Sequence, residues 1–191
     1  MSSRKALIER NTRETRIKAE VNLDGTGAGE INTGIGFFDH MLISLARHSL
    51  CDISITCKGD LDVDAHHTVE DVGISLGQAI AQSLGDKAGI ARYGSATVPM
   101  DEALVMSAID ISGRGSLEYA LKLEKEMIGS FDCELTPEFF KALAVNAGIN
   151  THIRQLEGKN AHHVVEAARA LREAVSIDDR VEGIPSTKGV L

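Results

Sequence analysis

The residues best suited to chemistry form two copies of a short histidine motif. HHTVED occupies residues 66–71, and HHVVEA occupies residues 162–167. In each copy a glutamate follows the first histidine by four residues, so on a helix the imidazole and carboxylate groups lie on one side. Helices that bind zinc or di-iron centres use this arrangement. One copy alone would be typical of a capped helix start with solvated histidines, whereas the recurrence indicates metal binding.

The two histidines of each pair are expected to reach different metal ions. Adjacent residues on a helix point about 100° apart, so their imidazole rings diverge. The two copies would then form two metal sites, each with ligands from both motifs. Glu70 follows His66 by four residues and His67 by three, and both spacings allow chelation. The assignment of Glu70 to one of the two sites therefore stays open.

Two further histidines are candidate ligands. His40 lies in FFDHML beside Asp39, which could accept a hydrogen bond from its ring, and His152 lies in THIRQL. A lone histidine more often bonds within its own helix, but the need for more ligands favours metal binding here. Three imidazoles and one carboxylate leave positions open on a six-coordinate ion. This set suits manganese or iron(II), although intrinsic affinity would favour zinc, nickel or copper.

Cationic and hydroxyl side chains occur in three glycine-punctuated segments. GIARYGS contains Arg92, DISGRGS contains Arg114, and IPSTKG contains Ser186, Thr187 and Lys188. Guanidinium groups, hydroxyls and the exposed amides of turns are the groups that bind phosphate oxygens. None of the three is a Walker or dinucleotide motif, and each alone is typical of a surface turn. Together with the metal motifs, they predict a phosphate pocket.

Composition and charge limit the functions available to the chain. Its 191 residues are 43% hydrophobic and 25% charged, as in ordinary globular proteins. The net charge of −8 argues against nucleic acid as a general partner, because phosphate backbones bind basic surfaces. The apolar runs are shorter than the roughly 20 residues that span a membrane. The first ten residues show no apolar signal core, so we expect a cytoplasmic protein with a small-molecule partner.

Apolar periodicity predicts two strands, a helix, a strand and a second helix in the first half of the chain. Asp64 is a plausible N-cap for the second helix. Cys51 and Cys57 alternate with isoleucines on one strand face, and with the isolated Cys133 they are expected to be buried free thiols. The elements are expected at 4–10, at 15–23, from Gly36, from Cys51, and from His66 to Gly85.

The second half repeats this order of elements. The FF pair at 37–38 matches one at 139–140, and the two HH pairs match, although the interval between FF and HH is six residues shorter in the second half. We therefore expect a single α+β domain over 1–191, made of two similar halves of about 1–90 and 91–191, with helices covering one face of each sheet. The second-half elements are expected at 95–100, 102–111, 115–123, from Thr136, at 148–158 and from His162.

Five motifs resemble one enzyme family in order and over nearly the whole chain. FFDHML, HHTVED, DISGRG, HHVVEA and PSTKG, together with the early NTRET, closely resemble imidazoleglycerol-phosphate dehydratase of histidine biosynthesis. The resemblance implies a duplicated ββαβα fold like domain 2 of ribosomal protein S5. It implies a large homo-oligomer, an octahedral 24-mer built from trimers, with manganese sites between subunits. It also implies the reaction, which is loss of water from imidazole glycerol phosphate to give imidazole acetol phosphate.

The resemblance also implies a role for each matching residue. Glu14 would reach the substrate from a neighbouring subunit, and Glu70 and Glu166 are the other candidate catalytic carboxylates. A metal on a ring nitrogen would stabilise negative charge on the ring, which helps to expel the hydroxyl from the carbon beside it, and a carboxylate, for which we favour Glu166, would then remove the C–H proton. Arg92, Arg114, Ser186 and Lys188 would bind the phosphate. Two Mn²⁺ would be held by His40, His66, His67, Glu70, His152, His162, His163 and Glu166.

One segment departs from the family pattern, and two other functions stay open. The family usually continues HHVVEA with a longer helix that carries a phosphate-binding lysine, whereas here AARALREAV follows and the next lysine is Lys188. Phosphate affinity or packing of the last helix is therefore expected to differ. A metal-dependent phosphoesterase would need more bridging aspartates than this chain offers. In a metal-storage or metal-assembled structural protein, the phosphate-type turns would have no function.

Overall fold

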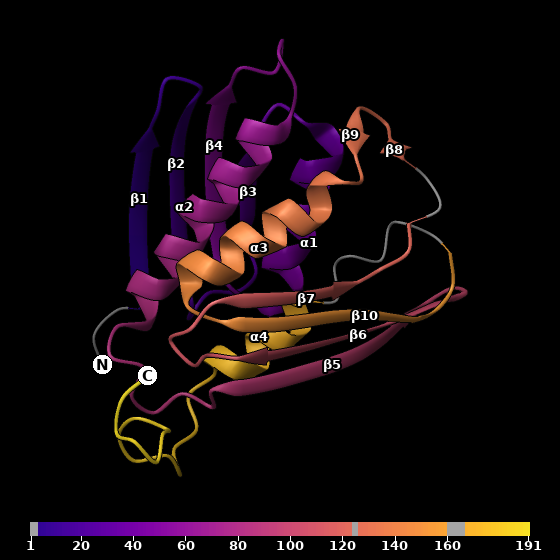
Figure 1. Ribbon diagram of the computed structural model, residues 1–191. Coiled ribbons are helices and arrows are strands. Elements are labelled where there is room, and N and C mark those ends of the chain that lie inside the picture. Colours follow the sequence, from indigo (N-terminus) through magenta and orange to yellow (C-terminus); the bar gives the residue numbers. More distant parts are fainter. Residues whose placement is uncertain (1–3, 124–125, 160–166) are drawn as a thin grey trace.

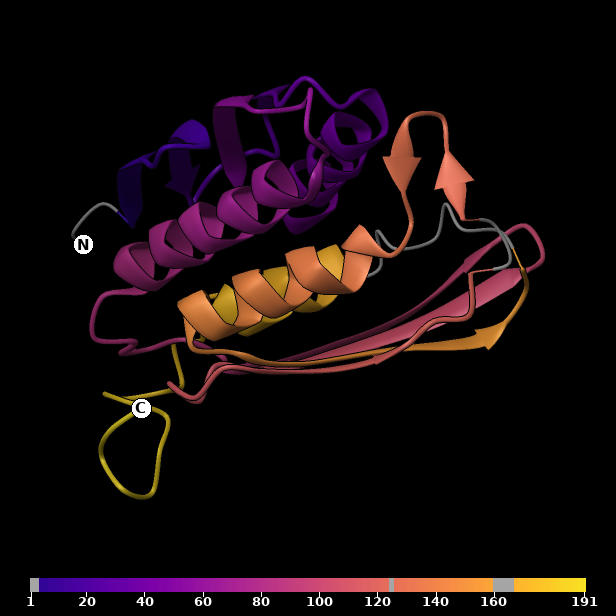
Figure 2. The ribbon, with the colours of Figure 1, turned by 45° about the horizontal axis from the view of Figure 1, so that its top comes forward.

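The fold consists of four layers, in which two sheets enclose two layers of helices. A computed structural model describes residues 4–123, 126–159 and 167–191. The helices of each half cover the inner face of their own sheet, and the two helix layers face each other (Figures 1 and 2). None of the described helices is both long enough and apolar enough to cross a membrane.

The first half contains one sheet and two helices, as predicted. The first sheet has the strand order β1-β2-β4-β3, and β3 pairs parallel to β4. Its elements are β1 (Lys5–Asn11), β2 (Thr15–Asn22), β3 (Gly29–Asn32), α1 (Gly36–Ser49), β4 (Asp52–Gly59) and α2 (His66–Leu84).

The second half repeats this topology, which confirms the predicted duplication. Its sheet has the order β5-β6-β10-β7, and each strand matches its counterpart in the first sheet. A short strand precedes the first helix of each half: β7 was expected at 115–123, whereas β3 was not expected. Among the described residues, the hairpin of β8 and β9 occurs in the second half alone. The elements are β5 (Tyr93–Met100), β6 (Ala103–Asp110), β7 (Ser116–Ala120), β8 (Met127–Ile128), β9 (Phe131–Asp132), α3 (Leu135–Ala147), β10 (Asn150–Glu157) and α4 (Ala167–Val175).

Helices α1, α2 and α3 begin within one residue of their predicted starts. The apolar side chains of α1 at three and four spacing, Phe38, Met41 and Leu45, are buried as their periodicity predicts. The N-cap position of α2 is Ala65, one residue after the predicted Asp64. The Asp64 carboxylate still accepts a hydrogen bond from the backbone N–H of His66 at 2.8 Å, so it satisfies one of the free donors at this helix end.

The last helix packs on its sheet as its counterpart in the first half does. Helix α4 contacts β5 and β6, just as α2 contacts β1 and β2. The contact is close, because a Cβ atom placed on Gly94 of β5 would lie 2.1 Å from the carbonyl oxygen of Ala170. The described part of α4 has 9 residues, compared with 19 in α2. The second histidine pair lies outside the described residues.

Two glycines on α2 allow the two halves to pack closely. A Cβ atom on Gly73 would lie 2.8 Å from the carbonyl oxygen of Phe139 on α3, and one on Gly77 would lie 2.6 Å from that of Leu143. The phenylalanine ring of Phe38 on α1 lies 5.2 Å from that of Phe139, measured between centroids. The two halves therefore share one hydrophobic core.

The three cysteines are free and buried, as predicted. Cys51, just before β4, and Cys57, within it, lie on the same buried face as Ile53 and Ile55. Burial raises the pKa of the Cys57 thiol to about 11. These thiols are hydrophobic packing groups and stay protonated at neutral pH.

Candidate active site

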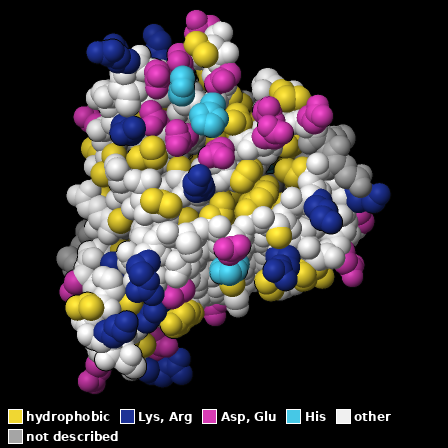
Figure 3. Space-filling model, viewed as in Figure 1, with side chains coloured by type: hydrophobic (Ala, Val, Ile, Leu, Met, Phe, Trp, Pro, Cys, Tyr) yellow, Lys and Arg dark blue, Asp and Glu magenta, His cyan; other side chains and the backbone are white. Residues whose placement is uncertain are grey.

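The three predicted phosphate segments meet at one cavity. They come from the start of β5, the turn between β6 and β7, and the C-terminal segment, and they enclose about 610 Å³. Figure 3 shows Lys and Arg side chains gathered at this end of the molecule, at the lower left. The residues lining the cavity include Arg92, Arg114, Ser186, Thr187 and Lys188.

Arg92 joins the sheet to the C-terminal segment. Its Nε donates to the Asp110 carboxylate at 2.7 Å, and its Nη1 donates to the carbonyl oxygen of Pro185 at 2.8 Å. The hydrogen bond to Asp110 raises the pKa of Arg92, so the guanidinium stays charged. The group also lies 4.7 Å from the ring centroid of Tyr93. These contacts hold the backbone just before Ser186 at the cavity.

Arg114 lies in a turn that hydrogen bonds to the side chain of Ser112 stabilise. The hydroxyl of Ser112 accepts hydrogen bonds from the backbone N–H of Arg114 at 3.3 Å and from Asn150 Nδ2 at 3.1 Å. Gly113 between them has φ +78°, a conformation that suits glycine. The side chain of Arg114 is exposed at the rim, where a guanidinium can meet an entering anion.

The first histidine pair lies at the start of α2, and the end of this helix is the one nearer to the cavity. The rings of His66 and His67 are 6.3 Å apart between centroids and their planes are inclined by 89°, so the two imidazoles diverge. His67 Nδ1 lies 3.0 Å from an oxygen of Asp60, a hydrogen bond that raises the pKa of His67. A ring held through Nδ1 by a carboxylate presents Nε2 to a ligand.

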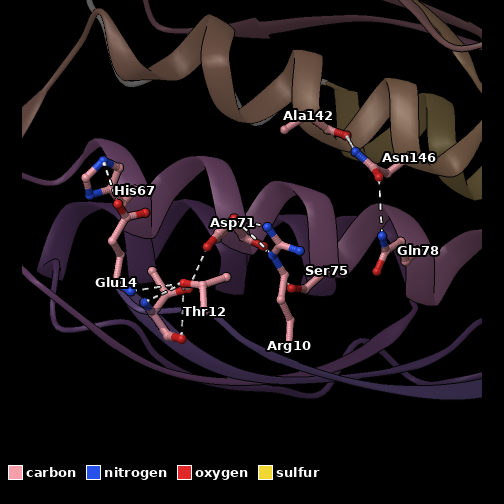
Figure 4. Close-up of polar contacts among 10 residues, drawn as sticks. Arg10, Thr12, Glu14, His67, Asp71, Ser75, Gln78, Ala142 and Asn146 are labelled. Carbon is pink, nitrogen blue, oxygen red and sulfur yellow. Dashed lines mark hydrogen bonds and ion pairs between the residues drawn. The ribbon is translucent and has the colours of Figure 1, made fainter.

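Glu14 reaches this histidine from the turn between β1 and β2. Its carboxylate oxygen lies 3.9 Å from His67 Nε2, and the two side chains face each other in Figure 4. Glu70 follows on α2 and is partly exposed. The structure thus brings together one imidazole and one carboxylate from the predicted set.

The other predicted metal ligands lie on separate elements. His40 is exposed on α1, where the neighbouring Asp39 accepts hydrogen bonds from the backbone and hydroxyl of Thr33. His152 on β10 alternates with buried Thr151 and Ile153, so it lies on the face of the second sheet that points away from the helices. Within the described ranges, no three His, Cys, Asp or Glu side chains form a group that could hold a metal ion. His162, His163 and Glu166 lie outside those ranges.

The histidine end and the phosphate cavity are separated by the length of a helix. Helix α2 begins at His66, and the chain reaches Arg92 soon after its end at Leu84 (Figure 1). Its 19 residues span ~27 Å at 1.5 Å per residue. In one copy of the chain, the first histidine pair and the predicted phosphate cavity therefore lie at opposite ends of α2.

Three acidic residues that support the site were missed by sequence reasoning. Asp110 pairs with Arg92, Asp60 with His67, and Asp71 with the turn that carries Glu14. Asp110 and Asp71 stand inside the quoted motifs DISGRG and HHTVED, so membership of a motif was the available signal. Asp60 stands in KGDLDVDA among other aspartates, where nothing local distinguishes it.

Comparison with known proteins identifies the family. A sequence model described as imidazoleglycerol-phosphate dehydratase matches residues 33–175. Curated relatives with this name include proteins of Desulforamulus reducens, 56% identical with all of both chains covered, and Moorella thermoacetica, 56% identical with 99% of each covered.

Solved structures agree with this result. The imidazoleglycerol-phosphate dehydratase of Staphylococcus aureus has a TM-score of 0.81 and 37% identity, with 91% of this chain and 99% of that chain covered. The enzyme of Pyrococcus furiosus, in complex with (S)-C348, also has a TM-score of 0.81 and 37% identity, with 96% and 100% covered. The class that the fold and its relatives define is the hydro-lyases, enzymes that eliminate water. The chain belongs to the imidazoleglycerol-phosphate dehydratase family.

Proposed function

We propose that this chain is a manganese-dependent dehydratase that converts imidazole glycerol phosphate into imidazole acetol phosphate in histidine biosynthesis. The observation that carries the proposal is the pairing of two complementary regions. A cavity lined by two arginines, a lysine and hydroxyls suits the phosphate, and the imidazole of His67, whose Nε2 lies 3.9 Å from the Glu14 carboxylate, is a donor of the type that would bind a metal.

The types of the donor groups fit Mn²⁺, and we propose two ions per active site. Imidazole nitrogens and carboxylate oxygens bind manganese in octahedral geometry. The hydrogen bond between His67 Nδ1 and Asp60 is the orientation that metal-binding histidines have. When bound, the metal would polarise the substrate ring and stabilise negative charge on it. The proposed ligands are His40, His66, His67, Glu70, His152, His162, His163 and Glu166.

The protein's own groups would bind the substrate and move its proton. Arg92, Arg114, Ser186 and Lys188 hold the phosphate through charge-assisted hydrogen bonds. The carbon attached to the ring loses its hydroxyl, and Glu166, as a general base, takes the proton from the next carbon, so that the resulting enol becomes the ketone. Glu14 and Glu70 are the other candidate catalytic carboxylates. Glu14 is exposed on its turn, where it can reach a substrate held by a neighbouring copy.

The length of α2 supports a site formed by more than one copy of the chain. Helix α2, which separates the two regions, is ~27 Å long over its 19 residues, and a substrate with one ring and a three-carbon chain cannot span this length. We therefore propose that one copy supplies the phosphate cavity and another the metal ligands at the start of α2. This supports a closed homo-oligomer, which we propose is a 24-mer built from trimers.

Complementation between two inactive variants tests the proposal. Arg114→Ala removes a phosphate contact and His67→Ala removes a metal ligand, so each variant alone is expected to lose most of its activity at substrate concentrations below the wild-type KM. When the two are dissociated, mixed and reassembled with Mn²⁺, sites that combine an intact cavity with intact ligands should regain activity. Arg180→Ala, a change of an exposed arginine with its side chain 89% accessible, is the matched control and should stay active.

The product distinguishes the alternatives. Mixed assemblies that form but stay inactive, while the wild-type chain makes the ketone, would contradict the shared site. Release of inorganic phosphate in place of the ketone would indicate a phosphoesterase. Metal uptake without turnover, unaffected by Arg114→Ala and Lys188→Ala, would indicate a storage or structural protein.

A further inference from the structure

Asp71 is a buried carboxylate that the proposed chemistry does not use. It follows Glu70 on α2, and only 9% of its side chain is exposed. Its Oδ1 accepts a hydrogen bond from Arg10 Nε at 3.0 Å, with Arg10 Nη2 at 2.8 Å, and its Oδ2 accepts one from the hydroxyl of Thr15 at 2.5 Å. Both partners lie beside the turn between β1 and β2. Asp71 therefore ties the helix to the two strands that bear this turn.

The bonding continues from Asp71 into the turn itself. The Thr15 hydroxyl lies 3.1 Å from the hydroxyl of Thr12. Thr12 Oγ1 accepts hydrogen bonds from the backbone N–H of Glu14 at 3.1 Å and of Thr15 at 2.9 Å. A chain of hydrogen bonds thus runs from the helix to the backbone of Glu14 (Figure 4).

The same helix face holds the histidine that Glu14 meets. His67 and Asp71 are four residues apart on α2 and lie on one side, one turn from each other. One turn of α2 thus presents the imidazole, and the next fixes the turn whose carboxylate lies 3.9 Å away. A buried ion pair adds little net stability, because desolvation offsets the attraction. Its contribution here is to geometry.

We infer that Asp71 is a positioning residue, which holds the turn that carries Glu14 in register with the first turn of α2. The inference rests on the proposed function, because Glu14 acts there on the substrate. The Thr15 hydroxyl is the link through which Asp71 acts.

Kinetics of single and double variants test this role. Asp71→Asn keeps the size of the side chain but loses its charge, and a misplaced Glu14 should lower kcat by about 100-fold with KM changed little. Thr15→Val, which removes the hydroxyl, should lower kcat similarly, whereas Thr15→Ser, which keeps the hydroxyl, should have a kcat close to that of the wild-type chain. In a Glu14→Gln background, Asp71→Asn should have almost no further effect, because the group that it positions is already removed. A purely structural role would lower kcat by the same factor in both backgrounds and would overturn the inference.

Hydrogen exchange gives a measurement that does not depend on turnover. In Asp71→Asn, the amides of Glu14 and Thr15 should exchange faster than in the wild-type chain, because their acceptor, the Thr12 hydroxyl, loses its support. Asp52→Asn is the matched control, because Asp52 fixes a turn at the other end of the same sheet and should leave these two amides unchanged.

The two proposals fail in different ways. A wild-type chain that makes no ketone with Mn²⁺ would refute the proposed function, and the exchange result would then decide the role of Asp71 alone. An active wild-type chain whose Asp71→Asn variant keeps both its kcat and its slow exchange at Glu14 and Thr15 would refute the positioning role only.

Discussion

At the scale of single residues, aspartates anchor the turns that surround the sites. Asp39 and Asp52 each accept two or more hydrogen bonds from a loop, and Asp71 accepts them from two strand residues that flank the turn between β1 and β2. Such bonds to an ionised carboxylate are stronger than those between neutral groups. Loss of one charge is therefore expected to loosen one turn without unfolding the sheet.

Asp52 provides a prediction about pH. Its carboxylate accepts hydrogen bonds from the backbone N–H groups of Thr26 at 2.8 Å and Ala28 at 3.0 Å, and these bonds lower the pKa of Asp52 below 3.8. The stabilisation is present above the unfolded-state pKa and is lost as the pH falls through the lower pKa of the folded state. Asp52→Asn should reduce the free energy of unfolding by about 1 kcal/mol at pH 7.

The measurement is urea denaturation at several pH values. The difference in unfolding free energy between wild type and Asp52→Asn should be constant near neutrality and should shrink as the pH falls below 3.8. A difference that grows in acid would show that the hydrogen-bonded carboxylate is not the source of the effect.

Arg114 provides a prediction about binding. A charge-assisted hydrogen bond to phosphate contributes about 1.5–3 kcal/mol, so Arg114→Ala should raise KM by roughly tenfold to 100-fold. Steady-state kinetics at a fixed Mn²⁺ concentration measure the change, with Arg180→Ala as the control. Inorganic phosphate should inhibit the wild-type chain competitively and the variant more weakly. Equal inhibition of both would place phosphate binding elsewhere.

At the scale of elements, the closest packing lies between α2 and α3. Gly73 and Gly77 face carbonyl oxygens of α3 at distances that leave no room for a methyl group. Gly73→Ala and Gly77→Ala should each destabilise the fold by about 1–3 kcal/mol, because the helices must separate. Thermal denaturation tests this, with Gly36→Ala as the matched control, since a Cβ there meets nothing within 4 Å. A destabilisation by Gly36→Ala of the same size would show that the effect is not due to packing.

Most elements were predictable because they are long and periodic. The stripe of α1 and the alternation along β2 and β4 each run through enough residues to reveal their period. Strand β3, with 4 residues, and strands β8 and β9, with 2 each, were not predicted. Such short segments show no period, and their pairing comes from neighbours that are distant in the chain.

The sequence allowed us to predict which residues belong to the candidate site more fully than how these residues are arranged. Arg92, Arg114 and Lys188 could be selected because each stands beside turn glycines, and the structure brings all three to one cavity. Their meeting depends on the sheet ends and the Arg92–Pro185 hydrogen bond, which no local pattern encodes. The place of His152 on the outer sheet face likewise follows from the register of β10.

At the scale of the whole molecule, the proposed ligands point in different directions. His66 lies at the start of α2, and His152 lies on the outer face of the second sheet. Metals shared by such residues would join different copies of the chain. Removal of metal with a chelator should therefore shift the assembly to smaller species, and Mn²⁺ should restore it, as size-exclusion chromatography with light scattering would measure. An assembly that keeps its mass after complete loss of metal would contradict metal-dependent association.

The length of α2 has a consequence for how activity depends on protein concentration. If each substrate molecule contacts two copies, catalysis requires association, so activity per chain falls on dilution once the copies separate. By mass action, a ligand that binds only to the associated form also stabilises it. Substrate would therefore protect the enzyme against dilution, and a cell with abundant substrate would keep more of its chains assembled.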